Sequence, residues 1–146
     1  MSAQRFTMPI YVAVFLQKDN QILLIKRSKS IICGGLYAMP GGGVDGLETL
    51  ADAAIREAHE ELGIIIDKKN LQFMHVQHVK RENNAEFIAF FFHTTQWTHE
   101  PAIMEPDKCD EVNWFSIDQL PQPMETSHQL ALELMQQHID FSQLGW

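Results

Sequence analysis

The chain has 146 residues, of which 45% are hydrophobic, and this size is expected for a single domain spanning residues 1–146 that needs no disulfides. Its formal net charge of −8 argues against a broad electrostatic grip on polymeric nucleic acid, because the 11 Lys and Arg residues form no long run. Cys33 and Cys109 are too few for a disulfide scaffold, so we expect two free thiols.

The N-terminal part predicts a β-hairpin. Residues 10–15 and 21–25 are rich in β-branched and aromatic side chains, and the polar segment Lys18-Asp19-Asn20 separates them. A glycine run follows in Met39-Pro40-Gly41-Gly42-Gly43, at a place where a strand can end. Glycines there allow backbone groups to approach a metal ion or a phosphate, although a triple glycine is usually only a turn.

Residues 50–62 predict an amphipathic helix. Thr49, followed three residues later by Asp52, is typical of a helix start, and Gly63 suits the left-handed position just after a helix end. The aliphatic side chains share one broad arc, and Glu57, Glu60 and Glu61 share an adjoining arc about 100° wide. Such like charges repel one another along a helix, which points to a divalent cation that offsets the repulsion.

Hard carboxylate oxygens are the ligands that magnesium or manganese prefers, and magnesium takes one or two carboxylates together with substrate phosphates. The helix therefore predicts a Mg²⁺ or Mn²⁺ site that receives a phosphorylated substrate. Because the chain is acidic, an ion would have to bridge its carboxylates to a polyphosphate. The alternative is an amphipathic helix whose glutamates are simply solvated.

The C-terminal half predicts a second hairpin from residues 71–79 and 86–95, a short strand at 112–115 and a helix from Thr126 to about His138. The run FIAFFF is apolar on both faces, which is typical of a strand covered on both sides. Mixed strands with two helices indicate an α/β/α sandwich. One face of this run packs a helix, and the other, including Phe91, is a candidate to line a base pocket.

A spaced motif carries the resemblance to a known family. Gly42, Glu48 and the segment Arg56-Glu57-Ala58-His59-Glu60-Glu61-Leu62-Gly63-Ile64 stand at the spacing of the Nudix box. The strand-like start, the approach Gly35 to Pro40 and the Trp114-Phe115 segment are also similar to Nudix domains. One departure is that Leu47, not glycine, directly precedes Glu48. The resemblance implies an α/β/α sandwich with a mixed β-sheet.

The resemblance also implies roles for the residues of the box. Glu57, Glu60 and Glu61 are expected to hold the metal ion, with the Gly42 carbonyl as a further ligand. The family does not fix the general base, for which we favour Glu60 or Glu57, because a metal-bound glutamate can accept a proton from the attacking water. Arg56 would form a bidentate salt bridge to Glu48 that orients the carboxylates.

Three further residues are candidates for substrate binding. Arg27 would meet a phosphate, unless it merely ends a strand. Glu105, in the segment Glu105-Pro106-Asp107-Lys108, resembles a position from which some relatives that act on nucleoside triphosphates draw a contact, although a solvated acidic loop is an equal alternative. Phe91 is the candidate for base contact.

The leading functional hypothesis is hydrolysis of a normal or oxidised (deoxy)nucleoside triphosphate to a monophosphate and pyrophosphate. An alternative is ADP-ribose, a sugar nucleotide or a dinucleoside polyphosphate, but residues 73–81 lack the proline or tyrosine that such relatives tend to show. A third possibility is a noncatalytic nucleotide sensor, a class that commonly loses box glutamates.

Partners and location are expectations of the same kind. No stretch of the sequence has the apolar length of a signal peptide or a membrane span, which favours a cytoplasmic enzyme with no membrane partner. The histidines share no zinc-like spacing with a cysteine, so we expect packing or surface positions for them. The family resemblance leaves a homodimer possible.

Overall fold

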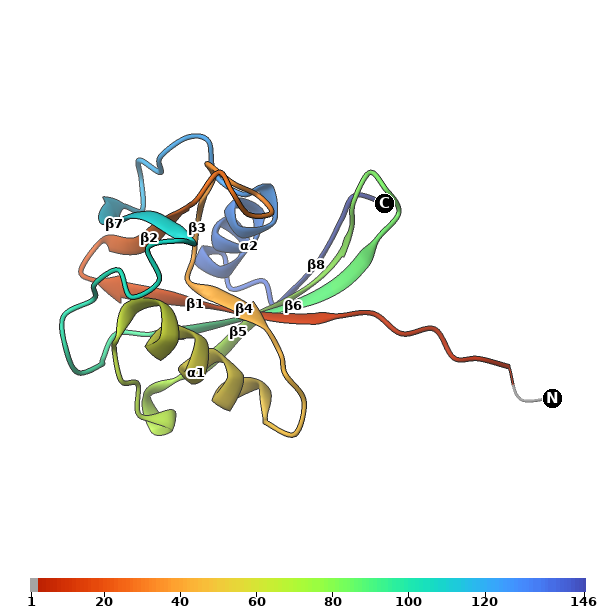
Figure 1. Cartoon of the computed structure of the whole chain (residues 1–146), viewed down its shortest axis with the longest axis horizontal. Helices are drawn as coiled ribbons and strands as arrows, with labels where there is room; N and C mark the ends of the chain where they lie inside the picture. The colour runs from red at the N-terminus through yellow and green to blue at the C-terminus, as the bar shows by residue number, and fades with distance from the viewer. Residues whose placement is uncertain (1–2) are drawn as a thin grey trace.

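A computed structural model describes residues 3–146 and contains strands, two α-helices and one short 3-10 helix (Figure 1). The first half comprises β1 (Ile10–Lys18), β2 (Gln21–Arg27), β3 (Tyr37–Ala38), β4 (Gly41–Gly43), α1 (Leu50–Leu62) and the 3-10 helix η1 (Lys68–Asn70). The second half comprises β5 (Gln72–Lys80), β6 (Glu86–Thr94), β7 (Cys109–Ser116), α2 (Thr126–Gln136) and β8 (Phe141–Leu144).

The strands of the described chain form one mixed eight-stranded sheet in the order β3-β2-β1-β6-β5-β8, with β4 paired to β1 and β7 paired to β2. β1 runs parallel to β6, and β5 runs parallel to β8, whereas the other pairs are antiparallel. The edge of β1 that does not face β6 pairs with two strands, β4 and β2. β4 pairs with Tyr11–Ala13, and β2 pairs only with Gln17 and Lys18. This divided edge brings the glycine strand β4 into the centre of the molecule.

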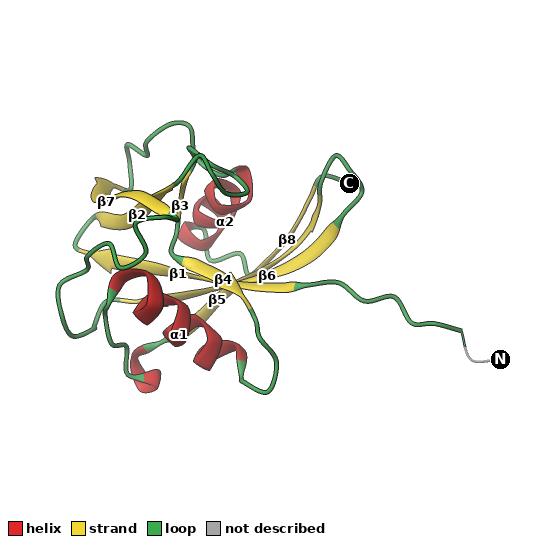
Figure 2. Cartoon of the chain, viewed as in Figure 1, coloured by secondary structure: helices red, strands yellow, loops and turns green. Residues whose placement is uncertain are grey.

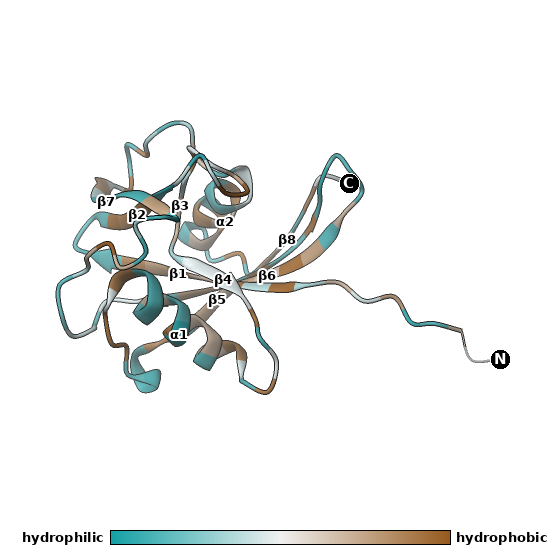
Figure 3. Ribbon diagram, in the orientation of Figure 1, coloured by the Kyte–Doolittle hydropathy of each residue, from teal (hydrophilic) through white to brown (hydrophobic). Residues whose placement is uncertain are grey.

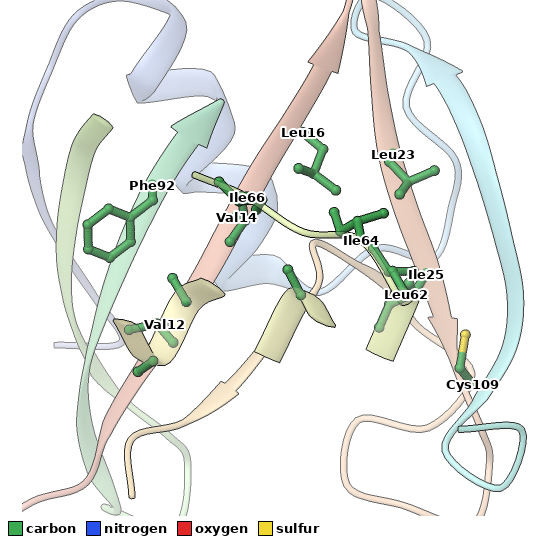
Figure 4. Packing of buried hydrophobic residues seen from close by; sticks show 13 residues of the cluster. Val12, Val14, Leu16, Leu23, Ile25, Leu62, Ile64, Ile66, Phe92 and Cys109 are labelled. Carbon is green, nitrogen blue, oxygen red and sulfur yellow. The ribbon is translucent and has the colours of Figure 1, made fainter. Parts of the chain in front are cut away.

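The two helices cover opposite faces of the sheet, so the predicted α/β/α sandwich is confirmed (Figure 2). Side chains alternate along β1: Val12, Val14 and Leu16 pack in the cluster with α1, and Ala13 and Phe15 pack in the cluster with α2. Figure 4 shows the first cluster, in which the β1 side chains meet residues of β2, β6 and the end of α1. Hydrophobic stretches along β1 and β6 are visible in Figure 3.

Helix α1 begins and ends as its sequence predicts. Thr49 Oγ1 accepts a hydrogen bond from the Asp52 backbone N–H at 3.0 Å, and Gly63 adopts a φ of 73°. The buried residues Ala54, Ala58 and Leu62 anchor the helix on the sheet. Anchoring of this face leaves the glutamates of the adjoining arc free to reach the loop that precedes the helix.

Several boundaries differ from the sequence prediction. β1 continues to Lys18, α2 ends at Gln136, and β3, β4 and β8 had not been predicted. β4 consists only of glycines, which have low strand propensity, and it forms because the β1 backbone lies close to it. A Cβ on Gly41 would stand 2.1 Å from the Val12 carbonyl oxygen, so this approach requires glycine. Neither helix within residues 3–146 has the length and apolar character needed to cross a membrane.

A buried polar network links β5, β8 and the start of α2. His75 Nδ1–H donates to the Ile139 carbonyl at 2.8 Å, and its Nε2 accepts from the Ser142 hydroxyl at 2.8 Å. Gln77 Nε2 donates to Ser142 Oγ at 3.1 Å and to the Ser127 carbonyl at 3.2 Å, while Ser127 Oγ donates to Gln77 Oε1. Every donor of this network has an acceptor, so the first turn of α2 is fixed on the sheet.

Substitution of Gln77 by Leu is expected to lower the free energy of unfolding by about 1–3 kcal/mol, because Ser127 would lose its buried partners. Gln77 is fully buried, and Ser127 is 3% exposed. Urea unfolding at constant pH would measure the loss. Substitution of the exposed Gln136 by Leu is the matched control and should change the value by less than about 0.5 kcal/mol. Equal values for the two variants would contradict a structural role for the network.

Candidate active site

Arg56 organises the loop and the acidic face of α1. Its Nε and Nη2 contact the two Glu48 carboxylate oxygens at 3.0 and 2.9 Å, which is the bidentate geometry expected from the sequence. Nη2 also donates to the Gly43 carbonyl at 3.1 Å, and Nη1 donates to Glu57 Oε1 at 2.9 Å. One guanidinium therefore ties the loop, the β4 strand and the helix together.

The charges around Arg56 reinforce one another. Hydrogen bonds from Arg56 lower the pKa of Glu48, and the bonds to Glu48 and Glu57 raise the pKa of Arg56. Arg56 therefore stays charged at every working pH. Glu60, one turn further along α1, lies 3.3 Å from Arg56 Nη1. The Glu60 side chain is 47% exposed, and this N–O distance is long for a charge-assisted hydrogen bond.

Glu57 and Glu61 lie against the glycine strand. The Gly41 backbone N–H donates to Glu61 Oε1 at 3.0 Å. A Cβ on Gly42 would stand 2.6 Å from the Glu57 carboxylate, so any side chain at this position would displace that carboxylate. The glycine run thus acts as a surface on which two carboxylates rest.

Burial and a nearby negative charge raise the proton affinity of both carboxylates. Burial raises the pKa of Glu61 to about 8, and the nearby Glu57 charge acts in the same direction. Burial is also the main reason why the pKa of Glu57 is raised, with the Glu60 charge adding to it against the opposing effect of Arg56. Two partly buried carboxylates with raised proton affinity form a site that favours binding of a cation.

We call the cavity beside these carboxylates the acidic cavity. Its volume is about 280 Å³, and its wall includes Glu57, Glu61, Glu105, Arg27, Lys108 and residues 41–43. Glu105 also contacts Lys108 Nζ at 3.4 Å. Arg27 Nε donates to the Ile32 carbonyl at 3.0 Å, and within residues 3–146 the Arg27 guanidinium forms no ion pair. Arg27 therefore offers free donors to an anion.

A second cavity, which we call the α2 cavity, adjoins the first. It has a volume of about 240 Å³ and shares Arg27 and residues 41–43 with the acidic cavity. The rest of its wall includes Tyr11, Phe87, Arg81, Glu125, Ser127 and His128. A ligand with an anionic part and a flat, partly apolar part would find both kinds of surface side by side.

The donor set fits a hard divalent cation. The acidic cavity offers carboxylate oxygens from two partly buried glutamates, and magnesium needs only one or two carboxylates when water and phosphate complete its shell. No group of three His, Cys, Asp or Glu side chains within residues 3–146 is arranged to hold an ion alone.

The structure brings most of the expected site residues together, but not all. Arg27, Gly42, Glu57, Glu61 and Glu105 line the acidic cavity. Glu60 turns instead to Arg56 at the helix surface. The remaining expected residue lies deeper: Phe91 is fully buried in the core, where its ring meets the His128 ring edge-on at a centroid distance of 5.3 Å.

Sequence reasoning missed the residues that complete the α2 cavity. Arg81, Glu125 and His128 come from a hairpin turn and from the start of α2, far from the glycine run along the chain. No local pattern marks them, because their proximity is created by the sheet order. The only available signal was the start of the C-terminal helix, which placed Glu125 and His128 in one turn.

Comparison with known proteins adds an independent finding. A family model described as the NUDIX domain matches residues 7–135. The ADP-ribose pyrophosphatase of Methanocaldococcus jannaschii is 33% identical over 106 residues, which are 73% of this chain and 60% of that protein. The NAD-capped RNA hydrolase NudC of Vibrio parahaemolyticus is 28% identical over 130 residues, which are 88% of this chain and 46% of that protein.

Among solved structures, the MutT NUDIX hydrolase from Burkholderia pseudomallei is similar with a TM-score of 0.81 and 32% identity, over 88% of this chain and 98% of that one. The curated relatives are longer, and the chain spans 60% or less of their length. The matched region includes Arg56, the partly buried Glu57 and Glu61, and the glycine strand β4.

Proposed function

The chain belongs to the NUDIX domain family, and from this premise we propose that it is a pyrophosphohydrolase that splits a nucleoside triphosphate into a monophosphate and pyrophosphate. The observation that carries the proposal is the pair of adjoining cavities. One is lined by the partly buried Glu57 and Glu61, and the other is partly aromatic. Water would attack the α- or β-phosphorus and lose a proton to the general base, while the bond from that phosphorus to the bridging oxygen breaks and the other phosphate group leaves.

In this proposal Glu57 and Glu61 hold Mg²⁺ or Mn²⁺, with Glu60 and the Gly42 carbonyl as further donors. When bound, the ion would polarise the phosphates and the attacking water. The general base is Glu60 or Glu57. Glu60 is the less constrained of the two, because Arg56 holds Glu57 at 2.9 Å but Glu60 only at 3.3 Å.

Two cations of the wall would neutralise the phosphates. Arg27 stands where the two cavities meet, so its free donors would bind the phosphate next to the nucleoside. Lys108 lines the acidic cavity and would reach the distal phosphates, held in place by Glu105. Glu105 thus acts on the substrate through Lys108 or through the ion.

A screen of common and oxidised nucleotides with Mg²⁺, read out as pyrophosphate release, tests the proposal. We expect at least one triphosphate to yield equal amounts of monophosphate and pyrophosphate, and we expect EDTA to abolish the release. If no triphosphate in the screen yields pyrophosphate, the proposal fails. The same result with intact nucleotide binding would favour the noncatalytic sensor.

A second candidate is hydrolysis of ADP-ribose, and it is favoured by the similarity to the ADP-ribose pyrophosphatase of Methanocaldococcus jannaschii. Its products would be adenosine monophosphate and ribose 5-phosphate. Including ADP-ribose, a sugar nucleotide and a dinucleoside polyphosphate in the same screen separates this candidate, because none of them releases pyrophosphate.

The stability of the metal-free protein should depend on pH through Glu61. Its pKa of about 8 in the folded protein lies above its ordinary value of 4.5, so the folded state binds more protons between these values. The stabilisation is complete below about pH 4.5 and is lost as pH rises to about 8. Urea unfolding in EDTA should show this decline, with a slope of at most about 1.4 kcal/mol per pH unit.

Saturating Mg²⁺ should flatten the decline, since a cation replaces the proton on the carboxylate. The variant Glu61→Gln carries no titrating group at this position and should show a shallower decline in EDTA. A wild-type slope that is the same with EDTA, with Mg²⁺ and in the variant would contradict the assignment of Glu61 to the ion site.

A further inference from the structure

The α2 cavity carries an inference about the base of the nucleotide, and this inference rests on the proposed function. Tyr11 and Phe87 provide an apolar wall, and their rings meet edge-on at a centroid distance of 5.2 Å. Polar groups enter the cavity from two other elements: Glu125 and His128 from α2, and Arg81 from the β5–β6 turn. A flat ligand with polar edges fits such a cavity.

Glu125 lines this cavity and does not cap its helix. It occupies the N-cap position of α2, yet its side chain makes no capping hydrogen bond. Its backbone is fixed, because the Glu125 N–H donates to the Tyr37 carbonyl at 2.8 Å and the Tyr37 N–H donates to the Pro123 carbonyl at 2.9 Å. The carboxylate side chain is 15% exposed, so it remains reachable from the cavity.

His128 fixes what the Glu125 carboxylate offers to a ligand. The Met39 backbone N–H donates to His128 Nδ1 at 2.9 Å, so Nδ1 is an acceptor and the neutral imidazole carries its proton on Nε2. Nε2 lies 3.1 Å from Glu125 Oε2. Within residues 3–146, the Glu125 carboxylate has no ion-pair contact other than this one to Oε2. The cavity therefore presents carboxylate oxygen as an acceptor.

We infer that Glu125 selects a guanine-type base, a 2-amino-6-oxopurine, by accepting hydrogen bonds from its N1–H and its 2-amino group. Guanine is the only one of the common bases that has two adjacent N–H donors on one edge. Adenine and cytosine pair one donor with a ring nitrogen acceptor, and that acceptor would face a carboxylate oxygen. Two acceptors that face each other cannot form a hydrogen bond, which makes the binding of adenine or cytosine unfavourable.

Arg81, which lines the same cavity, complements this selection. Its guanidinium carbon lies 4.9 Å from the centroid of the Phe87 ring, so the side chain is held along the aromatic wall. Arginine donors suit the O6 and N7 acceptors of guanine. An acceptor at α2 and a donor at the β5–β6 turn thus match two different edges of the same base.

Equilibrium binding of nucleoside monophosphates tests the inference without any hydrolysis. With calorimetry, GMP should bind at least about tenfold more tightly than AMP or CMP, and IMP, which keeps N1–H but lacks the 2-amino group, should fall between. The variant Glu125→Gln replaces one acceptor oxygen by a donor and should remove the preference for GMP. The variant Glu133→Gln, which changes an exposed carboxylate of the same helix, should keep it.

Equal affinities of the wild type for GMP and AMP would overturn the inference, and so would an unchanged preference in a folded Glu125→Gln variant. Thermal unfolding of each variant verifies the fold. Hydrolysis of triphosphates without base preference would remove only the guanine assignment. A clear preference for GMP with no triphosphate hydrolysis would instead remove the proposed function and leave the assignment in place.

Discussion

Substitution of Glu60 by Gln is expected to lower kcat by about 10²–10⁴-fold, the usual contribution of a general base. The substitution keeps the shape of the side chain but removes its charge and its ability to take a proton. Glu60 is 47% exposed and contacts Arg56 only at 3.3 Å or more, so the fold should not depend on it. Pyrophosphate release under saturating substrate and Mg²⁺ measures the rate.

Two further variants are measured beside it: Glu133→Gln is the control, and Glu57→Gln tests the other candidate for the general base. Glu133 is an exposed carboxylate on α2, and its substitution should leave kcat unchanged. If Glu57 is the base, Glu57→Gln should lose the larger share of the rate while Glu60→Gln keeps most of it. A folded Glu60→Gln protein and a folded Glu57→Gln protein that both retain wild-type kcat would contradict general-base catalysis by either residue.

These expectations depend on features that local sequence can encode. Helix α1 was predictable because its cap, its aliphatic arc and its terminal glycine lie within fifteen consecutive residues, 49–63. The Arg56 contact with Glu48 followed from the spacing of the motif, and it forms in the structure with both carboxylate oxygens. Local signals were sufficient where one helix and its preceding loop create the geometry.

Local signals failed where the sheet creates the geometry. β4 has no side chains that favour a strand, and it forms because β1 offers backbone partners to Gly41, Gly42 and Gly43. Glu125 and His128 reach the active site because the segment before α2 is bound to Tyr37, 88 residues away from Glu125 when counted along the chain (125 − 37). Pairings at this distance depend on the whole fold, which no single segment contains.

Glu60 also shows why the ligand set was only partly predictable. On a helical wheel the three glutamates share an arc, yet burial separates them. Glu57 is 13% exposed at its side chain and Glu60 is 47% exposed. Arg56 attracts Glu60 outward, while the glycine strand accommodates Glu57 and Glu61. Periodicity gives the direction of a side chain, and the neighbouring elements decide which contact it makes.

Substitution of Arg56 by Lys is expected to lower kcat by about 10²-fold and to weaken Mg²⁺ affinity by about 10–100-fold. Lysine keeps the charge, but one ammonium group cannot span Glu48, the Gly43 carbonyl and Glu57 together, as the guanidinium does. The loop and the helix would then no longer be joined by hydrogen bonds to one side chain. Steady-state kinetics and a Mn²⁺ or Mg²⁺ titration measure the two effects.

A double variant separates positioning from a direct role in the chemistry. If Arg56 acts through Glu48, the variant Glu48→Gln should lose a comparable share of the rate, and Glu48→Gln with Arg56→Lys should lose little more than either change alone. Substitution of the exposed Arg5 by Lys is the matched control and should alter neither kcat nor ion affinity. Fully additive losses would show that the two residues act independently. If both substitutions break the same Arg56–Glu48 interaction, the second one cannot remove its contribution to the rate again.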